Sequence, residues 1–116
     1  MRTVVVDGAN VMGSRPDGWW RDRAGAAARL HANLAGLGGD GMEFVLVLEG
    51  AAKAARIPAA ANVRVVLADG SGDDTIAALA DGETLVVTAD RELRRRCEQR
   101  GAEVVGPGWL LRHFEG

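Results

Sequence analysis

The amino-acid sequence predicts an α/β domain with three layers, in which helices cover both faces of a mainly parallel sheet of four to five strands. Short runs rich in Val and Leu alternate along the chain with segments of helical character, which implies right-handed crossovers between parallel strands. The runs are continuously apolar, as is typical of strands that are buried on both faces. The length of 116 residues fits one domain that spans residues 1–116.

Strands and helices are predicted in the following order. Four strong strands are expected over Thr3-Val6, Phe44-Leu48, Val63-Leu67 and Thr84-Thr88, and a weaker fifth over Glu103-Val105. The Asp-Gly pair that follows the first strand is typical of a turn. Helices are expected over Trp20-Leu37, Ala51-Arg56, Asp73-Ala80, Asp90-Arg100 and Trp109-Phe114. Clusters such as GSRPDG and ADGSGDD separate these elements.

Composition and charge narrow the classes of function. With 14 basic and 16 acidic residues the formal charge is −2, so any contact with nucleic acid must be local. The longest apolar runs are far too short to cross a bilayer, and no membrane association is expected. The single Cys97 cannot form an internal disulfide, which fits a reducing cytosol. We therefore expect a cytoplasmic protein.

Acidic residues follow each of the first four predicted strands. They are Asp7 after the first strand, Glu49 after the second, Asp73 and Asp74 a short loop after the third, and Asp90 after the fourth. The carboxyl ends of parallel strands lie along one edge of a sheet, where open α/β folds bind their ligands. Five carboxylates are thus predicted to converge on one rim.

A cluster of carboxylates is unstable unless its charge is neutralised by proton uptake through raised pKa values, by arginine partners or by a divalent cation. Two unit charges about 4 Å apart repel by roughly 1 kcal/mol in bulk water and about 4 kcal/mol at the effective dielectric of a protein surface. Hard oxygen ligands favour Mg²⁺ or Mn²⁺, so one or two such ions are expected at the rim. The alternative for Asp73 and Asp90 is that each caps the helix it precedes. That alternative leaves Asp74, and the pairing of Asp7 with Asn10, without an explanation.

The stretches VVVDGANVMG, GSGDDTIAALA and VVTADREL resemble the three motifs of the NYN domain, a branch of the PIN-like ribonuclease superfamily that includes the bacterial YacP-like proteins. The resemblance implies a PIN-like, Rossmann-like fold and a metal-dependent endoribonuclease. It assigns Asp7, Asp73, Asp74 and Asp90 to the acidic metal positions and places Asn10 beside the first Asp, while Glu49 matches only some relatives. Thr88 is expected either to hydrogen-bond across the rim or to have no role.

Single-stranded RNA is usually bound by phosphate contacts and by stacking of bases on aromatic rings. Trp19 and Trp20 lie beside Arg21 and Arg23, just after the loop that follows the first strand, although at least one Trp is expected in the core. The residues predicted to contact RNA are Arg15, Trp19, Arg21, Arg91 and Arg94.

Other classes of protein fit the sequence less well than a nuclease. A receiver domain or a dehalogenase-like phosphatase is disfavoured, the second because Ala9 stands where a further Asp is needed. The stronger rival is an RNA-binding or regulatory module on the same fold with little catalytic activity. The sequence leaves open whether a protein partner, such as an antitoxin or a ribosome-linked factor, is involved, and whether the chain is a monomer or a homodimer.

Overall fold

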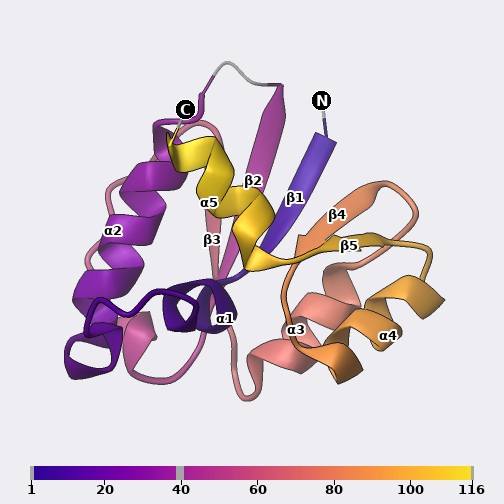
Figure 1. Cartoon of the computed structure of the whole chain (residues 1–116), viewed down its shortest axis with the longest axis horizontal. Coiled ribbons are helices and arrows are strands. Elements are labelled where there is room, and N and C mark those ends of the chain that lie inside the picture. The colour runs from indigo at the N-terminus through magenta and orange to yellow at the C-terminus, as the bar shows by residue number, and fades with distance from the viewer. Residues whose placement is uncertain (1, 39–40, 116) are drawn as a thin grey trace.

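The computed structural model describes residues 2–38 and 41–115, and within them the chain forms a five-stranded sheet. The strands are β1 (Arg2–Asp7), β2 (Met42–Leu48), β3 (Val63–Leu67), β4 (Thr84–Val87) and β5 (Glu103–Val105). They pair in the order β3-β2-β1-β4-β5, and every pairing between them is parallel. The prediction of a parallel α/β sheet is confirmed, and β1 lies at its centre (Figure 1).

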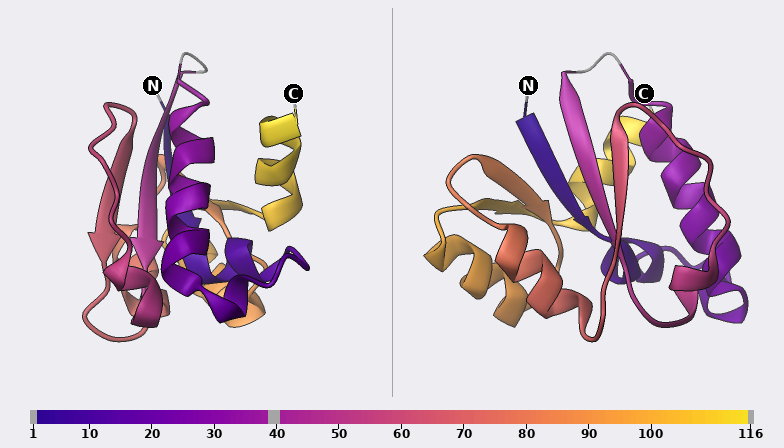
Figure 2. Two further views of the ribbon diagram at one scale, coloured as in Figure 1. Left: turned by 90° about the vertical axis from the view of Figure 1, so that its left-hand side faces the viewer. Right: turned by 180° about the vertical axis from the view of Figure 1, so that it is seen from behind.

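Helices cover both faces of the sheet (Figure 2). They are α1 (Gly8–Gly13), α2 (Arg23–Ala35), α3 (Gly72–Leu79), α4 (Arg91–Gln99) and α5 (Pro107–Glu115), with 3-10 turns η1 (Trp19–Arg21) and η2 (Gly50–Ala54). No helix within the described ranges is long and apolar enough to cross a membrane.

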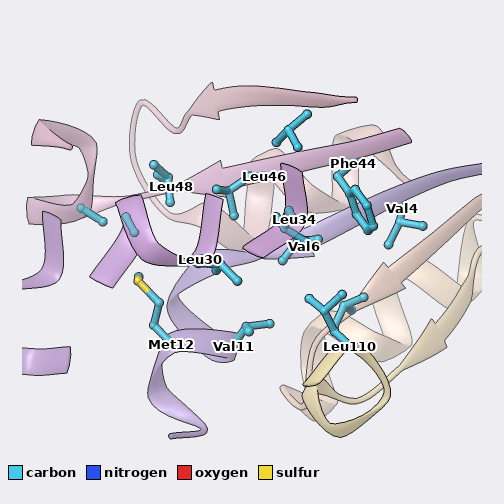
Figure 3. Close-up of a cluster of buried hydrophobic side chains, with 14 of the residues drawn as sticks. Val4, Val6, Val11, Met12, Leu30, Leu34, Phe44, Leu46, Leu48 and Leu110 are labelled. Atoms are coloured by element: carbon cyan, nitrogen blue, oxygen red, sulfur yellow. The ribbon is translucent and has the colours of Figure 1, made fainter. Parts of the chain in front are cut away.

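Two hydrophobic clusters, one on each face of the sheet, hold the three layers together. Alternation along β1 sends Val4 and Val6 to one cluster and Val5 to the other. The first cluster contains side chains from α1, α2 and α5, and Figure 3 shows Val11, Leu30 and Leu110 among them. The second contains side chains from α3 and α4. Because α3 and α4 share one face, the acidic residues at their N-termini start from the same side of the sheet.

The first difference from the prediction is that the Asp-Gly pair after β1 starts a helix rather than a turn. Asp7 is the N-cap of α1, since its carboxylate accepts a hydrogen bond from the Asn10 N–H. A Cβ at position 8 would lie 2.7 Å from the Val47 carbonyl oxygen, so only glycine allows α1 to pack this closely on β2.

The second difference concerns the start of α2, which begins at Arg23 rather than at Trp20. Asp22 is the N-cap, and its Oδ1 accepts a 2.9 Å hydrogen bond from the Gly25 N–H. Trp19 and Trp20 instead form the separate turn η1, which follows Gly18 with its positive φ of 77°. The two tryptophans are therefore presented by a loop, outside the long helix.

Candidate functional site

Asp7 lies at the centre of the carboxyl edge of the sheet and is almost completely buried, with 6% of its surface exposed. The Thr88 hydroxyl donates a 2.9 Å hydrogen bond to Asp7 Oδ2, and the Asn10 N–H donates to Oδ1 at 3.3 Å. Both bonds favour the ionised carboxylate, yet burial outweighs them and raises the pKa of Asp7 to about 6. The charges of Asp73 and Glu49 contribute to this rise.

A hydrogen-bond network joins Asp7 to the loop after β4. Thr88 Oγ1 accepts a 3.1 Å hydrogen bond from the Asp90 N–H, so the hydroxyl that binds Asp7 also fixes the start of α4. Asn10 Oδ1 accepts a 2.8 Å hydrogen bond from the Ala89 N–H. The expectation that Thr88 hydrogen-bonds across the rim agrees with this geometry. Asn10 acts on Asp7 through its backbone N–H and on the β4 loop through its side chain.

Asp73 and Asp90 enter the site from the N-terminal ends of α3 and α4. Asp90 caps α4, because its Oδ1 accepts a 3.0 Å hydrogen bond from the Leu93 N–H. Asp73 does not cap α3; that role falls to Ser71, and Asp73 lies in the first turn. Partial burial is the main reason that the pKa of Asp73 is raised, and the negative charges of Asp90 and Glu49 raise it further. The capping alternative is thus correct for Asp90 and wrong for Asp73.

Glu49 ties the end of β2 to the start of α3. Its Oε2 accepts a 2.8 Å hydrogen bond from the Gly72 N–H, and a Cβ at position 72 would lie 3.2 Å from the Glu49 carboxyl carbon. Glycine therefore lets the carboxylate approach the helix N-terminus, which stabilises its negative charge. We call Asp7, Glu49, Asp73 and Asp90 the acid cluster, since each is electrostatically coupled to at least one other member and none forms an ion pair within the described residues.

Asp74 does not join the acid cluster. Its Oδ1 lies 3.0 Å from Arg96 Nη2, and this exposed ion pair bridges α3 and α4 on their outer side. Asp74 follows Asp73 directly, and successive helical residues point about 100° apart. The two neighbouring aspartates are therefore separated by the turn of the helix.

The acid cluster offers carboxylate oxygens, the type of ligand that Mg²⁺ takes in proteins. Within residues 2–38 and 41–115 no member forms an ion pair with Lys, Arg or His. In the same ranges no three or more His, Cys, Asp or Glu side chains are arranged as a group that could hold a metal ion. Mg²⁺ is commonly bound by one or two carboxylates, with water and substrate phosphate as its other ligands. An ion held here would therefore take most of its ligands from water and substrate.

The two tryptophans near the predicted RNA contact have different surroundings in the structure. Trp19 packs against the hydrophobic core and Gly13, and Arg23 lies 5.1 Å from its ring centre. Trp20 is 54% exposed, and Arg21 lies 5.6 Å from its ring centre. Trp19 was the predicted stacking residue, but Trp20 has the free surface. The sequence indicated that one of the pair is buried and gave no signal for which one.

The predicted arginines occupy two separate regions. Arg91 and Arg94 are exposed near the start of α4; Arg94 pairs with Glu98 at 3.6 Å, whereas Arg91 forms no ion pair within the described residues. Arg15 is half-buried at the other end of α1, with its guanidinium 5.6 Å from the Phe114 ring centre. There it lines a cavity together with Arg29 of α2, a residue outside the set predicted to contact RNA.

The fold and the site define an α/β chain with a doubly wound parallel sheet and carboxylates gathered at the centre of its carboxyl edge. Two crystal structures of Rae1 (YacP) from Bacillus subtilis share this fold. The W164L mutant matches with a TM-score of 0.76 at 22% identity, covering 99% of this chain and 76% of that one. The second matches with a TM-score of 0.75 at 21% identity, covering 99% and 74%. No protein-family model and no curated protein sequence matches the chain.

Proposed function

We propose that this chain is a metal-dependent endoribonuclease of the NYN/PIN-like type that hydrolyses phosphodiester bonds of single-stranded RNA with Mg²⁺ or Mn²⁺. The observation that carries the proposal is the acid cluster, whose four carboxylates come from separate parts of the chain and form no ion pair within the described residues. Burial, and to a smaller extent the neighbouring carboxylates, raises the pKa of Asp7 and Asp73, and a divalent cation would offset this cost of holding them ionised. The resemblance to Rae1 (YacP) supports the proposal at the level of the fold.

Each member of the acid cluster has a distinct part in the proposal. Asp7 and Asp73 are the proposed principal ligands, because both have raised pKa values and neither carboxylate is paired with a cation that would hold it elsewhere. Glu49 and Asp90 each use one oxygen to accept a backbone N–H, which leaves the other for a water or an ion. A bound divalent ion would polarise the scissile phosphate and lower the pKa of a coordinated water.

Thr88 and Asn10 are positioning residues in this proposal. The Thr88 hydroxyl orients Asp7 Oδ2, and Asn10 holds the β4 loop so that Asp90 lies beside the same edge. Arg91 is exposed next to Asp90 and unpaired in the described residues, so it is placed to contact a phosphate that approaches the acid cluster. Trp20 offers an exposed ring on which an unpaired base can stack.

The experiment that tests the proposal compares two adjacent aspartates. Asp73→Asn removes a proposed ligand, whereas Asp74→Asn makes the same chemical change in the exposed ion pair with Arg96. With Mn²⁺ and a labelled single-stranded RNA, Asp73→Asn should lower the cleavage rate by more than about 100-fold, beyond the effect typical of residues that only orient a ligand. Asp74→Asn should cleave at nearly the wild-type rate. Equal rates for both variants, or full cleavage in excess EDTA, would refute the metal mechanism.

The second candidate is an RNA-binding or regulatory module without catalytic activity. It is favoured by the lack, in the described residues, of a ready three-residue metal group, and by arginines near α1 and α2 that do not depend on the acid cluster. Such a module would bind RNA in EDTA and Mn²⁺ alike and would not shorten it. Product length on a denaturing gel therefore separates the two candidates.

A further inference from the structure

A separate cavity of about 230 Å³ lies between α1, η1 and α2, on the face of the sheet that α2 covers. Its floor is apolar and includes Val11 and Met12 of α1 and Leu30 of α2, which lie opposite one another in Figure 3. Trp19 provides an aromatic wall. The cavity shares none of its lining residues with the acid cluster, so it is a second place at which the chain can hold a ligand.

Polar groups surround this apolar floor. Arg15 and Arg29 line the cavity, and neither forms an ion pair within the described residues. Asp17 and Asn33 also line it and supply a carboxylate and an amide that can hydrogen-bond a polar edge. A ligand that satisfies this lining has a flat apolar body, a hydrogen-bonding edge and an adjacent negative charge.

The size of the cavity limits the occupant further. Sites for drug-sized molecules are about 300–1,000 Å³, so a cavity of about 230 Å³ suits a smaller group such as one ring system. We infer that this cavity receives a single unpaired nucleobase of an RNA strand and that Arg15 and Arg29 bind the phosphates beside it. The arginines match the charge of those phosphates.

The position of the cavity links it to the acid cluster. Asp7 precedes the first residue of α1, and Val11 and Met12 near its end line the cavity. The six residues of α1 span about 9 Å, so one RNA strand can reach both places. The inference rests on the proposed function for the identity of the ligand as RNA, but it requires neither a metal ion nor cleavage.

Binding of fluorescein-labelled decauridylate, measured by fluorescence anisotropy in EDTA over a series of salt concentrations, tests the inference without hydrolysis. Ala32 lines the cavity from α2 and is exposed, so Ala32→Leu should fill the space without disturbing the core. It should weaken binding about tenfold and leave the salt dependence unchanged. Arg29→Ala should weaken binding and reduce the slope of log K against log salt concentration by about 0.7.

Two control variants carry the same types of substitution, Ala to Leu and Arg to Ala, at positions outside the cavity. Ala78→Leu alters an exposed residue of α3, and Arg64→Ala removes an exposed arginine of β3 that has no ion pair within the described residues. Both should bind like the wild-type chain. A decamer of abasic nucleotides gives a second measurement: it should bind wild type more weakly, and Ala32→Leu should then have no further effect.

Three results would overturn the inference. The first is that Ala32→Leu binds decauridylate with wild-type affinity. The second is that Ala32→Leu lowers the affinity for the abasic decamer as much as it lowers the affinity for decauridylate. The third is that the wild-type chain does not bind decauridylate. A chain that binds in this manner but does not cleave RNA with Mn²⁺ would refute the proposed nuclease and leave the base site standing. If instead the wild-type chain cleaves RNA and the Ala32→Leu variant binds decauridylate with wild-type affinity, the base site is refuted and the proposed nuclease stands.

Discussion

Replacing Asp7 with Asn should stabilise the chain in the absence of metal while it abolishes cleavage. Asp7 is buried at the carboxyl edge of the sheet, and burial is the main reason that its pKa rises from 3.8 to about 6. Because the folded state then binds its proton more tightly than the unfolded state, ionising Asp7 costs folding free energy. At 1.36 kcal/mol per pKa unit this cost is at most about 3 kcal/mol.

The sign of the pH dependence follows from the two pKa values. Below pH 3.8 the carboxyl group is protonated in both states and contributes no difference. As the pH rises from 3.8 to about 6 the unfolded state ionises first, so the wild-type free energy of unfolding falls, and above pH 6 the full cost is present. The carboxamide of the variant carries no charge and avoids this loss. Asp7→Asn should therefore gain about 1–3 kcal/mol at pH 7.5 and little below pH 4, after allowance for altered hydrogen bonds to Thr88.

Urea denaturation followed by tryptophan fluorescence, in EDTA at pH 7.5 and at pH 4, measures the difference. For a chain of this size the gain corresponds to an increase of about 1 M in the urea midpoint at pH 7.5. Asp69→Asn is the matched control, since Asp69 is exposed and outside the acid cluster, and its midpoint should not move. A lower midpoint for Asp7→Asn at pH 7.5, or an equal gain at both pH values, would show that the buried charge is not what destabilises the wild-type chain.

The remaining predictions concern neighbours of Asp7, the metal and the exposed indole. Thr88→Val should lower the free energy of unfolding at pH 7.5 by about 1–3 kcal/mol, because Asp7 Oδ2 loses its hydroxyl donor; thermal melts that coincide with wild type would contradict this. Mn²⁺ at 100 times its Kd should raise that free energy by about 2.7 kcal/mol at pH 7.5. The rise should shrink at pH 5, below the pKa of Asp7, and a rise that stays constant with pH would argue against Asp7 as a ligand. Trp20→Ala should weaken decauridylate binding about fivefold or more and leave the melting temperature nearly unchanged, because the side chain is 54% exposed; a large loss of stability would count against a stacking role.

The strands and most helices could be predicted from the sequence because their patterns are local. Runs such as Phe44-Leu48 and Thr84-Thr88 are apolar on both sides, and the structure buries them on both faces. The sequence also predicted five carboxylates at one edge, because parallel strands end there. Four of them, Asp7, Glu49, Asp73 and Asp90, influence one another's charge in the structure, and their role as metal ligands stays a prediction.

What the sequence did not predict depends on contacts between distant residues. The close packing of α1 on β2 depends on Gly8, which lies against the Val47 carbonyl oxygen, and no local pattern carries that contact. Asp74 leaves the acid cluster because Arg96, 22 positions later, pairs with it across two helices. The sequence also did not predict that Trp20 is exposed while Trp19 packs on the core, because this depends on how η1 is oriented relative to the core.

The short helix α1 would have a consequence for the products if the chain cleaves RNA as proposed. It begins next to Asp7 of the acid cluster and ends at the cavity proposed to receive a base, with hydrogen-bonded backbone between them. An RNA strand that is anchored by one base would therefore be cut at a constant offset from that base, and the helix would serve as a ruler. The number of nucleotides between the anchored base and the cut would then report the distance from the cavity to the acid cluster.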